Sequence, residues 1–283
     1  MKILVTGGFG FIGEHLVERL KNEGYEVISW DIKTGQDVCN PKLKEKDLDA
    51  IFHLACPVDP ANYQDVVLPT LLASSVGTYN MLELAKMNRA KFLYVSSSEV
   101  YGEVYKRPFR EDDLITLNPN NEREYYAAAK FIGETLTRTY QRYYGVNARI
   151  VRPFNIYGFG MRVNDTRVIP SFIRMIKSGF PVKLTGKGKA TRTFCYIDDF
   201  IEGISRAMFY PKTNGEVFNL GSDKLITMYE LAKLMKAQIE YVSERVGEQK
   251  NRKPNIAKAK RLLGWKATIS LKDGLEEMWK SYP

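Results

Sequence analysis

The sequence predicts an α/β protein built around a doubly wound parallel sheet. Three observations predict it. In the first half of the chain, short apolar segments typical of buried strands alternate with helical patterns. A glycine-rich turn separates the first strand from the first helix, and polar residues follow a later strand where such a sheet would place a ligand. With 283 residues, 44% of them hydrophobic, the chain is long enough to bury a full core.

The elements follow in order along the chain. Strands are expected at 3–5, 26–30, 50–54, 91–95 and 148–152, and helices at 14–22, 78–88, 125–144 and 169–178. We expect residues 1–155 to form a Rossmann-type nucleotide-binding domain. Residues 156–283 should form mainly a substrate-binding lobe, with some segments returning to the sheet. The helices at about 72–88 and 125–144 carry mixed apolar faces, which makes a homodimer seam plausible.

Composition narrows the class of protein. No run of 18 apolar residues and no cleavable signal pattern is present, so we expect a soluble, cytoplasmic protein. Three cysteines at no metal-like spacing and two histidines predict reduced thiols and no metal site. The net charge of +9 suits phosphate-bearing ligands or a solvated basic face, and no nucleic-acid module accompanies it. We therefore expect neither nucleic acid nor a membrane as a partner.

The glycine-rich turn reads TGGFGFIG at 6–13. Glycine spacing fits either Gly8-x-Gly10-x-x-Gly13 or Gly7-x-x-Gly10-x-x-Gly13, and both spacings bring backbone close to a pyrophosphate at a helix N-terminus. Asp31 closes the second strand, where a carboxylate would hold the ribose hydroxyls and favour NAD over NADP. The alternative is a simple glycine turn with an Asp that ends the strand.

The helix at 125–144 opens with YYAAAK. Tyr126 and Lys130 are four residues apart and therefore share a helix face. Moving a tyrosine pKa from about 10 to neutrality requires about 4 kcal/mol of preference for phenolate, and a neighbouring ammonium supplies part of it. Tyr125 competes with Tyr126, but its partner four residues on is the uncharged Ala129. Taken alone, the spacing is also that of an ordinary surface pair.

The segment SSSEVYG at 96–102 follows the fourth expected strand. A serine cluster there could be ordinary loop chemistry. Ligands of doubly wound sheets bind beyond the carboxyl ends of the strands, so the hydroxyls and the carboxylate of Glu99 could instead face a bound sugar.

Together these motifs resemble the extended short-chain dehydrogenase/reductases of the NAD-dependent nucleotide-sugar epimerase, dehydratase and decarboxylase group. The likeness covers nearly the whole chain and is greatest to the UDP-glucuronate decarboxylases (UDP-xylose synthases). It is carried by TGGFGFIG, HLACPVDPANY (53–63), SSSEVYG, NP (118–119), FNIYG (154–158), NDTRV (164–168), TRTFCYIDD (191–199) and NLGS (219–222).

The resemblance implies a role for each matching residue. Tyr126 is the acid/base with Lys130 as its partner, Ser97 bonds the sugar 4-hydroxyl, and Glu99 argues for lyase chemistry. Residues implied to bind NAD are Gly7, Gly10, Phe11, Ile12, Gly13, Asp31, Asp37, Val38, Leu54, Ala55, Tyr126 and Lys130. Residues implied to bind the nucleotide sugar are Ser98, Arg123, Asn155, Arg167 and Arg192. Each arginine could instead form a surface salt bridge, and Asp37 and Val38 could belong to an ordinary polar loop.

The implied reaction is redox-neutral. Tyr126 removes the proton of the 4-hydroxyl while hydride passes from C4 to NAD, and the resulting 4-ketone allows a C6 carboxylate to leave as carbon dioxide. Return of the hydride regenerates NAD, and Glu99 could orient water or shuttle the proton at C5. A 4-epimerase or a 4,6-dehydratase remains an alternative.

Three positions depart from the decarboxylase pattern: YYAAAK replaces CYDEGK, Gly160 replaces an arginine, and Thr185 replaces a tyrosine expected near uracil. The segment at 252–255 reads RKPN in place of R-x-P-D. These changes weaken the assignment of sugar and base. A non-catalytic dinucleotide- or nucleic-acid-binding protein is a further alternative, although a binder has no need of Ser97, Tyr126 and Lys130 together.

Overall fold

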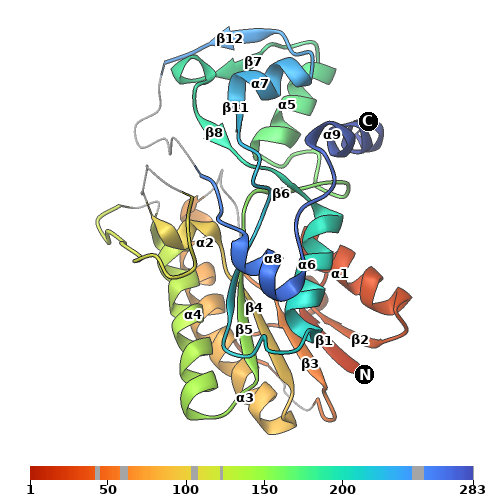
Figure 1. The fold of residues 1–283 in the computed structure, drawn as a ribbon, viewed down its shortest axis with the longest axis vertical. Helices are drawn as coiled ribbons and strands as arrows, with labels where there is room; N and C mark the ends of the chain where they lie inside the picture. The colour runs from red at the N-terminus through yellow and green to blue at the C-terminus, as the bar shows by residue number, and fades with distance from the viewer. Residues whose placement is uncertain (42–44, 58–62, 103–107, 122–123, 244–251, 283) are drawn as a thin grey trace.

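The computed structural model describes residues 1–41, 45–57, 63–102, 108–121, 124–243 and 252–282 (Figure 1). A central sheet of six parallel strands has the order β10-β5-β4-β3-β1-β2. Its strands are β1 (Lys2–Thr6), β2 (Glu26–Trp30), β3 (Ala50–His53), β4 (Lys91–Val95), β5 (Ala148–Pro153) and β10 (Val217–Leu220). The predicted fold class is confirmed.

Helices cover both faces of this sheet. On one face lie α1 (Phe11–Asn22) and α6 (Ile197–Phe209), and on the other lie α3 (Thr78–Asn88) and α4 (Tyr125–Tyr143). Helix α2 (Tyr63–Leu72) continues through a π-helical turn, Ala73–Gly77, into α3 and packs on α4.

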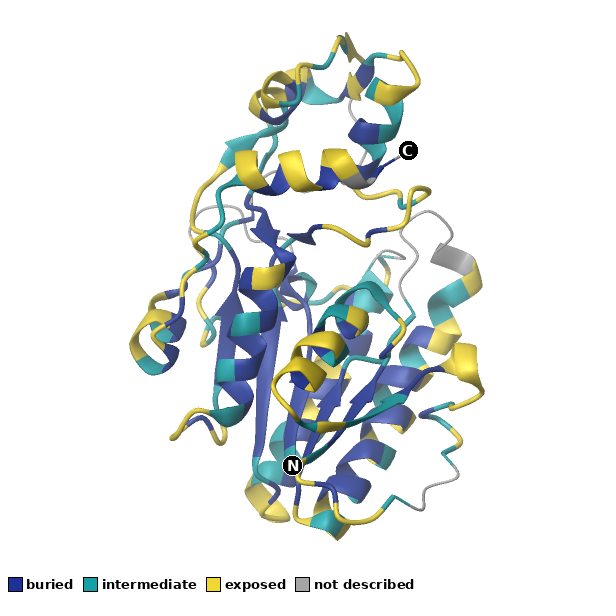
Figure 2. Cartoon of the chain, turned by 90° about the vertical axis from the view of Figure 1, so that its right-hand side faces the viewer, coloured by how far each residue is buried: buried dark blue, intermediate teal, exposed yellow. Residues whose placement is uncertain are grey.

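Two apolar cores follow from this layering, because side chains alternate along each strand. Ile3 and Val5 join the core on the α1 and α6 side, whereas Leu4 between them joins the core on the α3 and α4 side. The strands are therefore buried on both faces (Figure 2). This burial explains their nearly continuous apolar sequences.

The second half of the chain builds a smaller region above the carboxyl ends of the strands (Figure 1). It contains short strand pairs, β7 (Val182–Leu184) with β12 (Ile239–Tyr241) and β8 (Thr191–Arg192) with β11 (Ile226–Thr227). Its helices are α5 (Val168–Lys177), α7 (Met228–Leu234) and α9 (Leu271–Ser281).

The chain also returns to the sheet after residue 155. Strand β10 pairs with β5 at the edge of the sheet, and α6 and α8 (Ala257–Leu263) pack beside it. A further short pair, β6 (Ile156–Tyr157) with β9 (Cys195–Tyr196), lies where the chain passes between the two regions.

Each strand and helix expected from the sequence occurs within a few residues of its predicted bounds. Helix α1 begins at Phe11, three residues before the apolar pattern suggests, because the glycine turn leads directly into it. In the described ranges, no helix combines the length and apolar character needed to cross a membrane, and no three His, Cys, Asp or Glu side chains cluster as metal ligands. All three cysteines are free thiols.

Candidate active site

The glycine turn lies at the switch point of the sheet, where β1 is flanked by β2 on one side and β3 on the other. Gly7 has φ +71°, and a Cβ there would come within 2.9 Å of the Ala55 amide nitrogen, beside Leu54 at the end of β3. A Cβ at Gly13 would lie 2.0 Å from the Gly7 carbonyl oxygen. Both glycines are therefore required by geometry. A Cβ at Gly8 would also lie 1.9 Å from Ser29 Oγ, so the turn is crowded in either predicted register.

Helix α1 begins at the turn, with Gly10 as its N-cap and Phe11 and Ile12 in its first turn. Glycine has no side chain that could cap the helix, so the first amides remain available to an anion. The pyrophosphate of a dinucleotide requires glycines that let the backbone come close, a strand packed against the turn, and a helix N-terminus. The residues present therefore fit such a cofactor.

Asp31 stands beside this turn at the end of β2. Its Oδ2 accepts a hydrogen bond from the Phe9 amide (3.1 Å), and its Oδ1 accepts one from the Lys33 amide (3.1 Å). The carboxylate thus anchors the glycine loop and caps the turn Ile32–Thr34, which leaves its remaining lone pairs for a ribose. Asp37 accepts from the Cys39 amide (2.8 Å), and Val38 is buried.

Tyr126 and Lys130 lie on one face of α4, opposite the end of β4. The Lys130 side chain is buried, and its Nζ donates to the Val95 carbonyl oxygen at 3.0 Å. The same nitrogen lies 5.2 Å from the centre of the Tyr94 ring and 5.9 Å from that of the Tyr126 ring. The Ser97 hydroxyl lies near the Tyr126 phenol and lowers its pKa. The structure brings together the three side chains that the sequence singled out separately.

Burial is the largest influence on the pKa of Tyr126 and raises it. The thiol of Cys56 and the carboxylate of Glu99 act in the same direction, whereas the Ser97 hydroxyl and the charge of Arg167 lower the pKa. The protein alone thus keeps this phenol protonated. A cationic group bound against the ring is needed to favour phenolate, and an oxidised nicotinamide carries such a charge.

His53, the last residue of β3, is buried and makes two hydrogen bonds, a role that the sequence did not suggest. Its Nδ1 shares a hydrogen bond with Thr6 Oγ1 (2.7 Å) and its Nε2 one with Thr78 Oγ1 (3.1 Å). Burial first, and the charge of Lys130 second, lower the pKa of His53 to about 3. This imidazole is therefore neutral and ties β1, β3 and α3 together.

Glu99 is not an isolated carboxylate. Its Oε2 lies 3.0 Å from Arg252 Nη2, and the Arg252 guanidinium also donates to the carbonyl oxygens of Ser98 and Gly102. The Arg252 side chain is 3% exposed and that of Glu99 is 40% exposed. Sequence reasoning missed Arg252, and its only signal was the RKPN segment, which begins at this residue.

Two residues predicted to bind the sugar, Asn155 and Arg167, form bonds with other residues of the protein. Asn155, with φ 43°, donates from Nδ2 to the Thr193 carbonyl oxygen (2.8 Å). Arg167 pairs with Asp165 (2.6 Å), and its guanidinium carbon lies 5.6 Å from the centre of the Phe11 ring, so it stands beside the glycine turn.

Arg192 donates from Nη1 to the Thr191 carbonyl oxygen (2.8 Å) on β8. Gly160 has φ +84°, and a Cβ there would lie 3.2 Å from His15 on α1. Thr185 precedes the 3-10 turn Gly186–Gly188 in the upper region. Arg123 lies outside the described residues. The sugar-site assignments therefore stay predictions.

Comparison with known proteins places this site in context. The model of the NAD dependent epimerase/dehydratase family matches residues 3–221. UDP-glucuronic acid decarboxylase 1 of Arabidopsis thaliana is 39% identical over 98% of this chain and 69% of its own length. UDP-glucuronic acid decarboxylase 6 of the same plant is 38% identical over 100% of this chain and 89% of its own length.

Solved structures are similar over their whole length. A UDP-glucuronic acid 4-epimerase from Bacillus cereus, in complex with UDP-glucuronic acid and NAD, superposes with a TM-score of 0.86 at 31% identity, covering 99% of this chain and 98% of that one. A dTDP-glucose 4,6-dehydratase from Bacillus anthracis, in complex with NAD, gives a TM-score of 0.83 at 26% identity, covering 100% and 96%.

Proposed function

Because the chain belongs to the NAD-dependent epimerase/dehydratase family, we propose that it converts UDP-glucuronate to UDP-xylose and carbon dioxide through a transient 4-keto sugar. One observation carries the proposal beyond the family. Glu99 and Arg252 form an ion pair beside the Ser97 and Tyr126 pair. A carboxylate with a buried guanidinium at this position suits a substrate that itself bears a carboxylate.

NAD would lie on the glycine turn, with Gly7, Gly10 and Gly13 against its pyrophosphate, Asp31 against a ribose, and Lys130 and Tyr126 at the nicotinamide end. When bound, NAD supplies the reversible hydride acceptor that carbon C4 of the sugar needs.

The side chains of this protein would move the proton. Tyr126 as phenolate takes the proton of the sugar 4-hydroxyl, and Ser97, which lies near Tyr126, holds that hydroxyl in line. Once C4 is a ketone, the C5–C6 bond breaks, carbon dioxide leaves, and the electron pair becomes an enolate on the C4 oxygen. Protonation of C5 and reduction of C4 then complete the pentose, and Tyr126 returns its proton.

Arg252 would hold the substrate carboxylate through the guanidinium that now binds Glu99. A substrate carboxylate arriving at Arg252 competes with Glu99, which frees the Glu99 carboxylate to accept or deliver the proton at C5. When neutral carbon dioxide leaves, the negative charge passes to the enolate oxygen at C4, so Arg252 loses its carboxylate partner. The Glu99 carboxylate is in place to pair with the guanidinium again.

The test is to incubate the purified protein with UDP-glucuronate and NAD while following carbon dioxide release and product mass. A product lighter by carbon dioxide is expected. Glu99→Gln keeps the shape of the side chain and removes its charge, and it should slow carbon dioxide release by about 10²–10⁴-fold, the usual contribution of a general acid or base.

An epimerase acting on the same substrate is the second candidate, favoured by the structural likeness to the UDP-glucuronic acid 4-epimerase of Bacillus cereus. A new 4-epimer of unchanged mass would establish that reaction and overturn decarboxylation.

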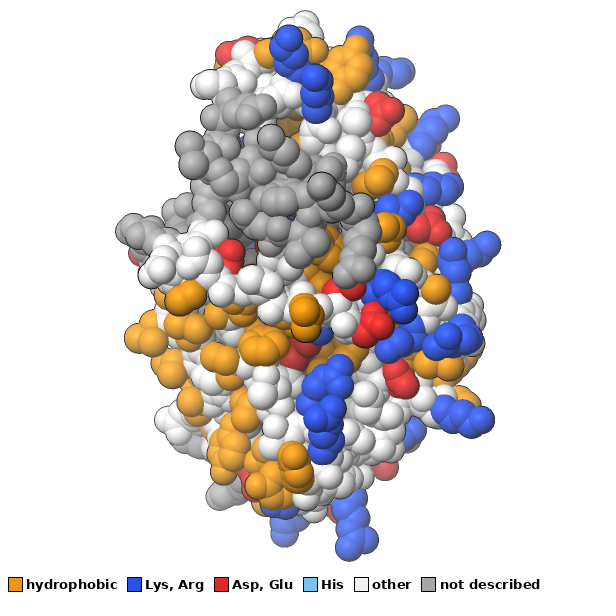
Figure 3. Space-filling view, turned by 60° about the vertical axis from the view of Figure 1, so that its left-hand side comes forward, with side chains coloured by type: hydrophobic (Ala, Val, Ile, Leu, Met, Phe, Trp, Pro, Cys, Tyr) orange, Lys and Arg blue, Asp and Glu red, His pale blue; other side chains and the backbone are white. Residues whose placement is uncertain are grey.

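We also propose that two copies associate through α2, α3 and α4. Six apolar side chains are exposed on these helices and the turn between α2 and α3: Leu68, Leu72, Val76, Tyr79, Phe131 and Ile132. Figure 3 shows apolar side chains gathered on the face that includes these helices. Such a surface is unfavourable in water, and pairing with its copy through a twofold axis would bury it.

A further inference from the structure

A fully buried ion pair lies behind the candidate active site. Arg152 on β5 and Glu134 on α4 form two parallel hydrogen bonds, Nε to Oε1 at 2.8 Å and Nη2 to Oε2 at 2.6 Å. Both side chains are 3% exposed. Ser96 Oγ donates to the same carboxylate at 2.6 Å. Removing two charges from water is costly, so a pair of this kind is weak evidence for stability, and its value lies in fixing geometry.

Glu134 belongs to the same row of α4 as the candidate catalytic side chains. Tyr126, Lys130 and Glu134 follow one another at intervals of four residues and therefore share one helix face. Arg152 and Ser96 hold the far end of this row against β5 and the end of β4. These bonds join α4 to β5 and to the end of β4.

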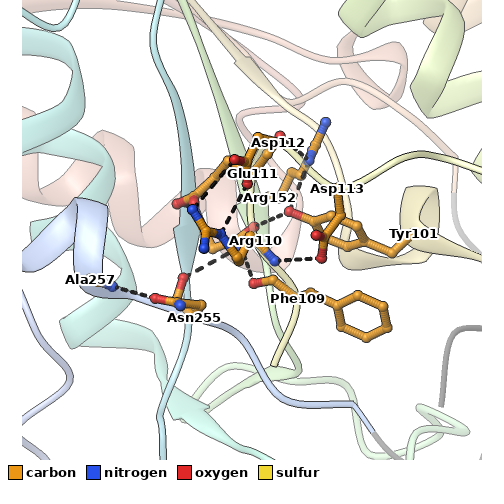
Figure 4. Close-up of polar contacts among 10 residues, drawn as sticks. Tyr101, Phe109, Arg110, Glu111, Asp112, Asp113, Arg152, Asn255 and Ala257 are labelled. Carbon is orange, nitrogen blue, oxygen red and sulfur yellow. Dashed lines mark hydrogen bonds and ion pairs between the residues drawn. The ribbon is translucent and has the colours of Figure 1, made fainter. Parts of the chain in front are cut away.

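The third nitrogen of Arg152 reaches a different element. Nη1 donates to the Tyr101 hydroxyl at 2.8 Å and to the Glu111 carbonyl oxygen at 3.3 Å. The guanidinium carbon lies 4.7 Å from the centre of the Tyr101 ring (Figure 4). Tyr101 ends the 3-10 turn Ser98–Tyr101, which carries Glu99. The Tyr101 hydroxyl in turn donates to Asn219 Oδ1 on β10 at 2.7 Å.

From Asn219 the chain of bonds continues to Arg252. Asn219 Nδ2 donates to the Phe109 carbonyl oxygen at 2.9 Å, and the Phe109 amide donates to the Lys253 carbonyl oxygen at 2.8 Å. The Asn255 amide donates to the Phe109 carbonyl oxygen at 2.8 Å, and Figure 4 draws both residues together with Arg152 and Tyr101. The backbone on the C-terminal side of Arg252 is thus fixed by the same network.

We propose that Arg152 is a positioning residue that holds α4, the turn Ser98–Tyr101 and the backbone next to Arg252 in one fixed arrangement. In this arrangement Tyr126, Ser97 and Glu99 meet the substrate together. The inference rests on the proposed role of Tyr126. Arg152 is buried behind these groups and acts only through them.

The first test is Tyr101→Phe, which removes one hydroxyl and leaves every charge paired. It breaks the link from Arg152 to Asn219. We expect kcat for UDP-glucuronate to fall by about 10–100-fold, as small misplacements of reacting groups do, with KM within about threefold. An unchanged kcat in the folded variant overturns the proposal.

The second test compares two guanidinium groups on β5. Arg152→Met removes the positioning residue, and Arg149→Met is its matched control, because Arg149 is also buried but donates to the carbonyl oxygens of Phe92 and Asn147. Both variants should lose stability, and only Arg152→Met should lose kcat in protein that circular dichroism shows to be folded. Equal loss of kcat in the two variants contradicts positioning.

A third readout needs no substrate. The phenolate of Tyr126 is titrated in NAD-loaded protein by ultraviolet absorbance, as the difference from Tyr126→Phe in the same background. Tyr126 is faced by Ser97, Cys56, Glu99, Arg167 and Lys130. The Ser97 hydroxyl lowers its pKa, so Tyr101→Phe should move the midpoint to higher pH, and Arg149→Met should not.

The two proposals fail in different ways. If the wild type releases no carbon dioxide yet Tyr101→Phe moves the Tyr126 midpoint, the proposed reaction is wrong and the positioning role stands. If the wild type decarboxylates UDP-glucuronate while Tyr101→Phe keeps both the wild-type kcat and the wild-type midpoint, the positioning role is wrong.

Discussion

Two adjacent tyrosines begin helix α4, and Tyr126 is the one that shares a helix face with Lys130. The Lys130 ammonium lies 5.9 Å from the centre of the Tyr126 ring, and the Ser97 hydroxyl lowers the pKa of Tyr126. We expect Tyr126→Phe to lower kcat by about 10²–10⁴-fold, because a positioned acid/base contributes that much. Carbon dioxide release at saturating substrate measures it.

Tyr125→Phe is the matched control, since it removes the same group one position away. Its kcat should stay within a few-fold of wild type. A loss in Tyr125→Phe that equals the loss in Tyr126→Phe would show that the helix face has been assigned wrongly.

His53 makes the folded protein sensitive to acid. Its pKa is lowered to about 3 when buried, whereas an unfolded chain holds it near 6.5. Between these values the unfolded state binds more protons, so stability falls as the pH drops from 6.5 toward 3, by up to about 1.4 kcal/mol per pH unit. His53→Gln removes this contribution, and urea unfolding at pH 4.5 and pH 7 should show a smaller difference than in wild type.

His15 provides the comparison for this experiment, because it is the only other histidine and lies partly exposed on α1. The loss of pH dependence should be larger in His53→Gln than in His15→Gln, because burial lowers the pKa of His53. If both variants keep the full dependence, the acid sensitivity arises from carboxylates elsewhere.

At the scale of elements, the turn between β1 and α1 leaves little room for side chains larger than glycine. A Cβ at Gly13 would lie 2.0 Å from the Gly7 carbonyl oxygen, so Gly13→Ala must push the helix away from the strand. We expect it to lower the melting temperature and to abolish NAD binding, as thermal unfolding and titration calorimetry can measure.

Gly10→Ala separates these two effects. A Cβ at Gly10 would lie 3.2 Å from the Gly7 carbonyl oxygen, a much longer contact than the 2.0 Å at Gly13. We expect its melting temperature to stay near that of wild type while its NAD affinity falls, because the methyl group occupies the approach to the pyrophosphate. Equal melting temperatures for the two variants would contradict the steric argument.

The long periodic segments were the predictable elements. Helices α3 and α4 and the five predicted strands of the central sheet follow from their hydrophobic pattern, because each is long enough to show one. Two-residue strands such as β6 and the π-helical turn Ala73–Gly77 carry no pattern long enough to detect. Their form depends on tertiary contacts, which a local window of sequence does not contain.

The site was predictable only in part, for the same reason. Ser97, Tyr126 and Lys130 each stand within a short motif, and the structure brings them together. Arg252 is 153 residues from its partner Glu99, and Arg152 carries no motif at all. Contacts of this kind follow from how strands are ordered in the sheet, so the two arginines were found only from the structure.

At the scale of the whole molecule, the exposed apolar face predicts the assembly state. Leu72 ends α2 within this face and is 41% exposed. Leu72→Glu places a charge in the proposed seam, so we expect a monomer by light scattering where the wild type is a dimer.

Leu114→Glu is the matched control, because Leu114 is 88% exposed in a loop outside these helices. It should leave the mass in solution unchanged. A wild-type protein that is monomeric at all concentrations would rule out the seam.

Because β10 comes late in the chain, the central sheet is completed late in synthesis. During synthesis β5 is complete long before β10, its partner, leaves the ribosome, because more than 60 residues separate them. In that interval the outer edge of β5 presents unpaired backbone, which invites association with other nascent chains. A fragment that stops at residue 155 would keep this edge open permanently. We therefore expect residues 1–155 on their own to be prone to aggregation, because β5 then lacks β10 as its partner.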